Sequence, residues 1–345
     1  MRVSVAMTTY NGESFIKKQL MSIIHQTRMV DEIVIGDDAS TDHTISIISE
    51  CLSKCSIDNN IIINNTNLGL EQNMRNVLKK CSGDIIIFSD QDDLWLPDKV
   101  ERIITCFNNN TDMRGVLTAF KVIDKNDGLF FKNESDDNVW INIKSDNTYE
   151  PIKLTAKSLI QINRGPGCTL AVKREVIDIY LKSESTLIHD WQCGLIAALL
   201  NGMYYLPAIT TYYRIFNNTI GMNINTKEEV KWHIKLKQML LSARYYLFFA
   251  DPIEFSGNIL NLGHDTLNKI TKACGITTES DDLCTYFKFE EELSKVLKGH
   301  KVLAYLAVRH KYRSEFDQQQ IALTFEQKCN YTFRHIRLLF EKTKL

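Results

Sequence analysis

The sequence of 345 residues lacks several features that would assign a protein class at once. The formal net charge is only −1, so no global basic surface supports binding to nucleic acid. No apolar run reaches the ~18 residues that a membrane-spanning helix needs. The amino-terminal stretch MRVSVAMTTYNG has no secretory signal pattern. We therefore expect a cytoplasmic protein without a spanning helix.

The cysteines also lack a pattern that would carry chemistry. There are nine of them, an odd number, and none forms a Cys-x-x-Cys pair. Cys51 and Cys55 are four positions apart, but no second pair or histidine cluster completes a zinc site. We interpret the cysteines as reduced thiols.

The first half of the chain alternates short apolar runs with segments of helical spacing. Strands are expected at 3–7, 31–36, 61–63 and 85–88, and helices at 13–27, 42–52, 70–81 and after Pro97. This alternation predicts an α/β fold with a Rossmann-like, mostly parallel sheet flanked by helices. Ligands of such sheets bind at the carboxyl ends of the strands. Neither Gly-x-Gly-x-x-Gly nor Gly-x-x-x-x-Gly-Lys occurs there, so both common phosphate-binding fingerprints are excluded.

The pattern changes twice further along the chain. Residues 125–155 are polar and rich in turn signals, which predicts a loop. A strand at 165–172, a helix at 191–200 and short strands at 203–206 and 210–213 follow. After residue 225 long helical spacing dominates, so we predict a catalytic domain over 1–225 and a helical region over 226–345.

The stretch FSDQDDLW places Asp90, Asp92 and Asp93 directly after the apolar run 85–88. Carboxylates this close repel one another, and burying them is costly unless a positive charge compensates them. Mg²⁺ or Mn²⁺ bound by one or two of these acids and by a nucleotide diphosphate would do so. The alternative is a solvated, Asp-rich turn.

Several ordered motifs resemble family 2 glycosyltransferases, which have the GT-A fold. They are TTYNGESFIKKQLMSIIHQT, EIVIGDDASTDHT, NLG at 67–69 with Asn73, FSDQDDLW, GPGCTLAVKRE, HDW at 189–191 and YR at 213–214 followed by NNTIG. The set covers roughly residues 1–225 and is most similar to the bacterial rhamnosyltransferase branch, which builds O-antigens and other surface polysaccharides.

The resemblance implies roles for matching positions on the donor side. The residues it assigns to the nucleotide sugar are Thr8, Thr9, Tyr10, Asn11, Glu13, Asp37, Asp38, Asn67, Asn73, Asp90 and Arg214. Within this set Asp38 would read the nucleobase and Arg214 would contact phosphate. The alternatives are a helix-capping role for Asp37 and Asp38, a helix-surface position for Asn73 and a surface position for Arg214.

The resemblance also implies a metal and a general base. Asp92 would bind a divalent cation directly with help from Asp90, and Asp93 is a candidate cap of the next helix. Asp190 would remove the proton of the acceptor hydroxyl, although an acid there also suits a helix cap. Gly165, Gly167, His189 and Trp191 are assigned to the acceptor side. For these four, a simple turn, a structural histidine and a core tryptophan are the alternatives.

One position departs from the family pattern. The rhamnosyltransferase branch usually has a histidine that completes the metal site, and Phe216 stands near that place here. Phenylalanine cannot bind a metal, so an extra water, Asn217 or Asn218 would have to substitute, or metal binding is weak or lost.

The carboxyl-terminal region is basic. From Lys295 to Leu345 there are eleven Lys or Arg against four Asp or Glu, so the preceding part carries −8 by difference. One interpretation is a peripheral contact with anionic lipid on the inner face of the cytoplasmic membrane. The others are a helical bundle packed on the catalytic domain and a homodimer interface.

The sequence therefore predicts an inverting, metal-dependent glycosyltransferase. L-rhamnose from dTDP-rhamnose is the first choice of donor, and the hydroxyl of a polyprenyl-diphosphate-linked glycan is the expected acceptor. Transfer of galactose, glucose or N-acetylhexosamine from a UDP donor is the first alternative. A non-catalytic protein that binds nucleotide sugar or glycan is the second. A processive synthase is disfavoured, because no Gln-x-x-Arg-Trp motif occurs.

Overall fold

The computed structural model describes residues 1–129, 150–161, 163–183 and 187–216, and isolated helical residues between 269 and 312. Asn217, Asn218 and most of the predicted helical region 226–345 lie outside these residues. The domain boundary after residue 225 therefore stays a prediction. Within the described part, no helix is both long and apolar enough to cross a membrane.

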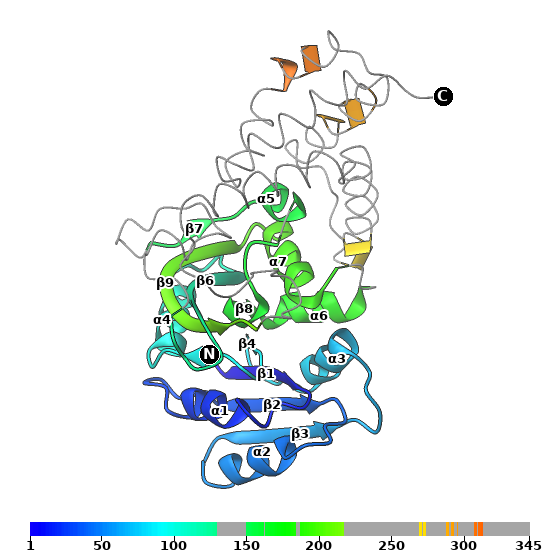
Figure 1. Cartoon of the computed structure of the whole chain (residues 1–345). Coiled ribbons are helices and arrows are strands. Elements are labelled where there is room, and N and C mark those ends of the chain that lie inside the picture. Colours follow the sequence, from blue (N-terminus) through cyan, green and yellow to red (C-terminus); the bar gives the residue numbers. More distant parts are fainter. Residues whose placement is uncertain are drawn as a thin grey trace, which may run out of the picture.

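The described strands form one mixed sheet (Figure 1). They are β1 (Val3–Thr9), β2 (Glu32–Asp37), β3 (Asp58–Ile63), β4 (Ile85–Ser89), β5 (Leu94–Trp95), β6 (Gly115–Ile123), β7 (Ile152–Lys153), β8 (Leu170–Lys173) and β9 (Met203–Arg214). The strand order is β3-β2-β1-β4-β8-β6-β9-β5, and β7 pairs with β9. Strands β3, β2, β1 and β4 are parallel to one another, as are β6 and β9, whereas β8, β5 and β7 run antiparallel to their neighbours.

Helices cover both faces of this sheet (Figure 1). They are α1 (Ile16–Ile24), α2 (Thr44–Leu52), α3 (Leu70–Lys80), α4 (Lys99–Asn109), α5 (Ala156–Gln161), α6 (Arg174–Lys182) and α7 (His189–Leu199), with a short 3₁₀ turn, η1 (Gly167–Thr169). Helices α1, α2 and α4 pack in one core cluster, and α3, α5, α6 and α7 pack in the other. The described part of the chain is thus a three-layer α/β structure.

Strand sequences explain the two cores. Successive side chains of a strand point to opposite faces. In β4, Ile85 and Ile87 accordingly join the cluster of α1, α2 and α4, whereas Ile86 and Phe88 join the cluster of α3, α6 and α7. A strand buried on both faces must be apolar throughout, which is why β4 reads as an uninterrupted apolar run.

The predicted α/β class with a mostly parallel sheet is confirmed, with several corrections to individual elements. The sequence interpretation omitted β6, a central strand of nine residues. It also split β9 into two strands, whereas one strand of twelve residues runs through Pro207 with irregular pairing to β6. The strand β7 lies inside the predicted loop over 125–155. Finally, η1 replaces the first part of the strand predicted over 165–172.

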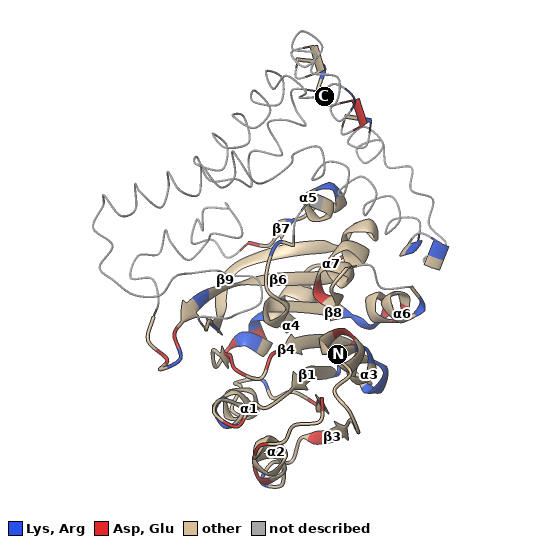
Figure 2. Ribbon diagram, turned by 45° about the vertical axis from the view of Figure 1, so that its right-hand side comes forward, with Lys and Arg blue, Asp and Glu red and all other residues tan. Residues whose placement is uncertain are grey.

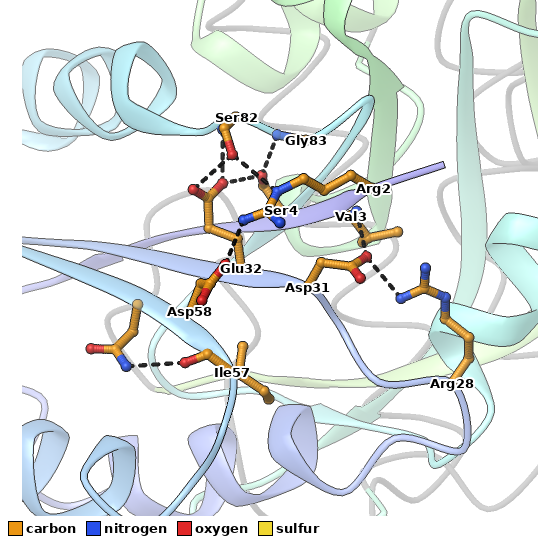
Figure 3. Close-up of polar contacts among 11 residues, drawn as sticks. Arg2, Val3, Ser4, Arg28, Asp31, Glu32, Ile57, Asp58, Ser82 and Gly83 are labelled. Atoms are coloured by element: carbon orange, nitrogen blue, oxygen red, sulfur yellow. Dashed lines mark hydrogen bonds and ion pairs between the residues drawn. The ribbon is translucent and has the colours of Figure 1, made fainter.

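The amino ends of the parallel strands carry a network of polar contacts (Figure 3). The Arg2 guanidinium donates to Asp58 at 2.8 Å, which links the start of β1 to the start of β3. Glu32 of β2 accepts hydrogen bonds from the Ser82 backbone N–H at 2.7 Å and from the Ser82 hydroxyl at 2.9 Å. The Ser4 hydroxyl also donates to Glu32 and accepts a hydrogen bond from the segment before β4. These contacts fix the starts of four neighbouring strands.

Candidate active site

Three loops converge at the carboxyl edge of the parallel strands. In the register of the sheet, Thr9 of β1 lies beside Asp37 of β2, and Met7 lies beside Ser89 of β4. The segments 10–13, 38–41 and 90–93 therefore begin next to one another. Acidic segments after β4 and at the start of α7, red in Figure 2, belong to this end of the molecule.

Asp37 is a structural acid in the turn after β2. Its Oδ2 accepts hydrogen bonds from the Thr9 hydroxyl at 2.8 Å and the Ser40 hydroxyl at 2.6 Å, and its Oδ1 accepts the Ser40 N–H at 2.8 Å. The residue is fully buried. His43 occupies the N-cap position of α2, so neither Asp37 nor Asp38 caps that helix. Asp37 instead joins the ends of β1 and β2.

Asp38 anchors the loop that leads into α3. Its carboxylate accepts the backbone N–H groups of Leu68 and Gly69, each at 2.8 Å, and Asn64 Nδ2 at 2.9 Å. Asn73 is buried, donates to a β2 carbonyl at 2.8 Å and accepts from Asn64 at 3.0 Å. Asn73 is therefore a buried amide of α3 that supports this loop and not a helix-surface residue. The role of Asp38 toward a nucleobase stays a prediction.

The first loop is tied to the acidic turn by Gln91, which the sequence interpretation did not single out. The Gln91 side chain accepts the Tyr10 N–H at 2.9 Å and donates to the Tyr10 carbonyl at 3.1 Å. Tyr10 is 47% exposed, whereas Thr8 is buried. Asn11 has a positive φ of 46° and accepts the Thr41 N–H at 2.9 Å. An exposed aromatic ring on a fixed backbone is suited to packing on a planar ligand.

Two further predicted donor residues lie on the exposed rim. Glu13 accepts the His43 backbone N–H at 3.0 Å and pairs with His43 Nδ1 at 2.9 Å. These hydrogen bonds lower the pKa of Glu13. Asn67 is exposed and accepts the Gly69 N–H at 3.1 Å. Both side chains shape loops at the edge of the site.

In the acidic turn after β4, one buried carboxylate oxygen has no hydrogen-bond partner among the described residues. Asp93 is buried, and its Oδ1 accepts the Arg214 N–H at 2.9 Å. Its Oδ2 is buried without a hydrogen-bond partner among the described residues. Asp98 is the N-cap of α4, so Asp93 does not cap that helix. A buried carboxylate oxygen without a donor is costly, which points to a positively charged ligand.

Burial raises the pKa of every acid in this turn. For Asp90 burial is the main cause, and the nearby charge of Asp190 adds to it. For Asp92 burial and the charge of Asp90 raise the pKa to about 7. For Asp93 burial and the charges of Asp92 and Asp90 raise the pKa well above its usual range. The turn therefore favours a bound positive charge.

These residues fit a hard divalent cation. Carboxylate oxygens are the protein ligands that Mg²⁺ and Mn²⁺ prefer, and a cation would neutralise the crowded acids. One atom each of Asp90, Asp93 and Cys168 lie within 4.8 Å of one another, and this is the grouping found in the described part of the chain. Asp93, which the sequence suggested as a helix cap, is instead grouped with Asp90. Direct coordination by Asp92 stays a prediction.

A buried lysine lies beneath the same turn. Lys99 is fully buried, and its ammonium donates to the Cys168 carbonyl at 2.6 Å and the Thr211 hydroxyl at 2.8 Å. It also lies 4.3 Å from the centre of the Trp95 ring. Burial lowers the pKa of Lys99 to about 8, and the nearby acids oppose that shift. Lys99 joins α4, η1 and β9 under the acids.

Arg214 is buried and not a surface arginine. Its guanidinium donates to the Asp92 carbonyl at 2.6 Å, to the Asp124 carbonyl at 2.5 Å and to the Asp127 carboxylate at 2.6 Å. It also stacks 4.9 Å from the Phe15 ring centre. The guanidinium thus holds the acidic turn and the turn over 124–128 in place. If Arg214 contacts phosphate as predicted, it has to give up some of these hydrogen bonds.

Phe216 packs against the Phe15 ring, which Arg214 also contacts. The centroids of Phe216 and Phe15 are 5.1 Å apart, with tilted planes. The position that carries a metal-binding histidine in the resembled branch is therefore part of an aromatic contact in this chain. The proposed substitutes Asn217 and Asn218 lie outside the described residues.

Asp190 lies in the first turn of α7 and is buried. Its Oδ1 accepts the Trp191 N–H at 2.7 Å, and its Oδ2 accepts Asn163 Nδ2 at 3.1 Å. Burial raises its pKa, while His189 and these two donors oppose the shift. Ile188, and not Asp190, is the N-cap of the helix. A carboxylate with a raised pKa is a stronger base than an exposed one.

The remaining residues predicted for the acceptor side separate into two groups. Gly167 lies against Asp190, because a β-carbon at Gly167 would be 3.3 Å from both Cβ and Oδ2 of Asp190. Gly165 packs on other side chains, with a virtual β-carbon 3.1 Å from Thr169. The Trp191 indole donates to the Leu159 carbonyl at 2.5 Å and packs against the apolar core. Trp191 therefore has a structural role in the fold.

His189 is fixed by an acid that the sequence interpretation missed. Glu71 of α3 accepts the His189 backbone N–H at 3.0 Å and pairs with its Nδ1 at 2.8 Å. The imidazole stacks on Phe88 with centroids 5.7 Å apart. Glu71, Lys99 and Asn163 complete the site without belonging to an acidic or glycine-rich motif, and Gln91 is the uncharged member of the acidic motif. The sequence did contain a signal for Lys99, because a positively charged residue six positions after Asp93 could lie close to the acidic turn.

Comparisons with known proteins identify the family of this chain. The model of the family "Glycosyl transferase family 2" matches residues 4–176. The dTDP-rhamnosyl transferase RfbG of Shigella flexneri is 33% identical over 242 residues, which is 65% of this chain and 77% of RfbG. An uncharacterised glycosyltransferase of Nostoc sp. is 28% identical over 241 residues, covering 66% of this chain and 70% of that protein.

A solved structure supports the fold. The crystal structure of Staphylococcus aureus TarS residues 1–349 in complex with UDP superimposes with a TM-score of 0.51 at 15% identity. The match covers 100% of this chain and 93% of that one. With a matched family model over half of its length, this chain belongs to glycosyl transferase family 2 and is a glycosyltransferase with a GT-A-type fold.

Proposed function

We propose that this glycosyltransferase is an inverting enzyme that transfers L-rhamnose from dTDP-rhamnose to a sugar hydroxyl of a lipid-linked bacterial glycan. The similarity to a dTDP-rhamnosyl transferase supports the choice of donor. Asp190 is the general base, and the acids at 90–93 hold the cation and diphosphate. Asp38 and the loop over residues 8–11 hold the nucleoside.

One observation carries the proposal. Asp190 is a buried carboxylate at the start of α7 that lies against Gly167, and the next residue, Cys168, is grouped with Asp90 and Asp93 after β4. The base and the candidate cation site therefore lie beside the same turn, η1. A protein that only binds nucleotide sugar needs the cation site but not the buried Asp190. Burial of an additional carboxylate costs stability, so such a protein would gain nothing from it. The catalytic interpretation accounts for both.

The transfer step uses the protein's own groups as follows. The Asp190 carboxylate accepts the proton of the acceptor hydroxyl while that oxygen forms a bond to the anomeric carbon. The bond between the anomeric carbon and the diphosphate oxygen breaks on the opposite face, and its electron pair leaves with the diphosphate. Asn163 holds one oxygen of Asp190, and Gly167 leaves room beside it. The anomeric configuration is inverted.

Asp90 and Asp93, with Asp92 between them in the turn, would hold a Mg²⁺ or Mn²⁺ ion. Such an ion stabilises the negative charge of a leaving diphosphate. The backbone and Gln91 contacts described above hold the acidic turn against the first loop.

A donor panel tests this function. The full chain is incubated with Mn²⁺ and dTDP-rhamnose, UDP-galactose, UDP-glucose or UDP-N-acetylglucosamine, and release of nucleoside diphosphate is measured. We expect release from dTDP-rhamnose. Release from a UDP sugar alone would keep the enzyme class and reject rhamnose as the donor. Binding of a donor without any release, with acceptor glycans present, would support the non-catalytic alternative.

The acceptor and the place of action form a separate part of the proposal. A polyprenyl-diphosphate-linked acceptor lies at the cytoplasmic membrane, and the basic segment 295–345 would bind the anionic surface. Co-sedimentation with vesicles of phosphatidylglycerol and phosphatidylcholine tests this contact. Binding that is equal for neutral and anionic vesicles, or absent from both, would reject it.

A further inference from the structure

Glu71 is the one acid of α3's first turn, and it reaches across to the start of α7. Its Oε2 accepts the His189 backbone N–H at 3.0 Å, and its Oε1 pairs with His189 Nδ1 at 2.8 Å. A single carboxylate thus holds both the helix terminus and the ring of the same residue. The two residues are 118 positions apart in the sequence. This contact is a built feature of the fold and not a local capping pattern.

The contact decides which ring nitrogen carries a proton. A carboxylate can only accept hydrogen bonds, so His189 Nδ1 must be the donor. Among the residues that the structure describes, the hydrogen bonds of His189 run from its backbone N–H and from Nδ1 to Glu71, and none involves the other nitrogen, Nε2. Stacking on Phe88, at an interplanar angle of 17°, fixes the plane of the ring. Nε2 is therefore held in a defined direction and is open to a ligand.

Acidic groups surround this imidazole. Glu71 approaches from α3, Asp190 follows on α7, and Asp90 comes from the turn after β4. Burial lowers the pKa of His189, but the Glu71 hydrogen bond and the charges of the three acids outweigh it and raise the pKa. Arg75, the basic residue one turn further along α3, lies over Tyr180 and donates to carbonyl oxygens at the end of α6. The surroundings therefore favour an imidazolium with a proton on each nitrogen.

We propose that Glu71 is a positioning residue that holds His189 through Nδ1 and thereby presents Nε2–H to an anionic oxygen of the donor diphosphate. The inference rests on the proposed function, because it requires a nucleoside diphosphate donor in this site. The positively charged imidazolium of His189 would then stabilise the negative charge of the diphosphate together with the metal ion. Glutamate is required for both contacts, because the amide of glutamine has an acceptor only on one of its two terminal atoms.

Nitrogen-detected NMR of the histidine rings tests the geometry without any turnover. The chain has eight histidines, so H189Q is used to assign the signal of His189. In the wild type we expect Nδ1 to be protonated at all pH values and Nε2 to titrate. In Glu71→Gln the titration should move to lower pH. Glu50→Gln is the matched control, because Glu50 is an exposed acid on α2 that pairs with Lys54.

Binding of dTDP in the presence of Mn²⁺ tests the ligand. Replacement of the charged imidazolium donor by a neutral amide should weaken dTDP binding about tenfold in H189Q and a few-fold in Glu71→Gln, and leave thymidine binding unchanged. Glu50→Gln should bind both ligands as the wild type does. Addition of dTDP should also shift the Nε2 signal of wild-type His189.

Two results would overturn the proposal. One is a wild-type His189 whose Nδ1 lacks the proton, a measurement that needs no variant to fold. The other is unchanged dTDP affinity in a folded H189Q. A shifted titration in Glu71→Gln with dTDP bound but no transfer to any acceptor would keep this proposal and reject the proposed function. Normal rhamnosyl transfer in both variants, with unchanged dTDP affinity, would reject this proposal and keep the proposed function.

Discussion

The two ends of the parallel strands differ in how they treat acidic side chains. At the amino end, Asp31 accepts the Val3 N–H at 2.8 Å and a guanidinium nitrogen of Arg28 at 2.9 Å. These contacts outweigh burial and lower the pKa of Asp31. At the carboxyl end, Asp93 has a buried oxygen without a donor in the described part of the chain, and burial raises the pKa of the acids around it.

The comparison separates structural acids from functional ones. An acid whose oxygens are satisfied by the fold contributes to stability and has little capacity for a ligand. An acid that is buried without a partner costs stability, and the site can recover that cost only when a cation or a substrate binds. Asp37 shows that position alone is not decisive, because it lies at the carboxyl end and is fully satisfied by Thr9 and Ser40.

The largest expected effect is loss of transfer in Asp190→Asn. The amide cannot accept the hydroxyl proton, so the rate of transfer should fall by about 10²–10⁴. Affinity for dTDP with Mn²⁺ should remain, since Asp190 contacts no donor group in the proposal. Asp178→Asn, an exposed acid on α6, is the control. Full activity of the Asp190 variant would remove this residue from the mechanism.

A smaller effect is expected for Gly167→Ala. The new β-carbon would lie 3.3 Å from Cβ and Oδ2 of Asp190 and would displace the carboxylate by a few tenths of an ångström. We expect kcat to fall about tenfold with little change in melting temperature, because misplaced catalytic groups lose rate steeply. Gly194→Ala on α7 is the control, since its β-carbon would meet only ordinary contacts at 3.9 Å. Equal kinetics of the two variants would contradict the placement of Asp190 at the reacting atoms.

The carboxyl end should also show an inverted dependence of stability on pH. Burial and Asp90 raise the pKa of Asp92 to about 7, so the folded chain favours its protonated form. Its stabilising contribution is therefore complete below the ordinary pKa of about 3.9 and is lost as the pH rises through about 7. Asp92→Asn in EDTA at pH 8 should melt roughly 2–4 °C higher than the wild type.

Mn²⁺ sharpens that measurement. The ion should raise the melting temperature of the wild type and have a smaller effect on Asp92→Asn. A variant that melts lower than the wild type in EDTA at pH 8 would show that Asp92 behaves like the satisfied acids of the amino end. The proposed contrast between the two ends would then be wrong for this residue.

The smallest effect is expected at the amino end. Asp58→Ala removes the ion pair with Arg2, whose side chains are 42% (Arg2) and 70% (Asp58) exposed. Exposed pairs contribute little, so the melting temperature should fall by less than about 2 °C. The difference should shrink further in about 0.5 M salt. Transfer activity should not change, and a loss of activity would show that the amino end affects the site.

Individual elements show how far the sequence could be interpreted. The apolar runs of β1, β2 and β4 and the helical spacing of α3 were sufficient for the α/β class, because these patterns are set by neighbours along the chain. The strand β6 was omitted although the turn-forming residues 110–112 precede it. Its pairing with β8 on one side and β9 on the other is a tertiary feature. The sequence interpretation also divided β9 into two short strands, although one strand runs through Pro207, a residue that is rare inside a sheet.

The site was predicted unevenly for the same reason. The order of motifs was enough to group the loops after β1, β2 and β4, and the register of the sheet brings these loops together. The inward direction of Asp93 could not be predicted, because it depends on the Arg214 N–H, 121 positions away. Gln91 and Lys99 were likewise missed, since their partners lie on other elements.

The sequence by itself determined the α/β class, the family and the segments that carry acids, because local periodicity and motif order depend on short stretches of chain. Only the tertiary structure decided which acids are satisfied and which are not. Whether a carboxylate stabilises the fold or favours a ligand depends on donors brought from distant elements. Examples are the Thr9 hydroxyl for Asp37, the His189 N–H groups for Glu71 and the missing donor at Asp93 within the described residues.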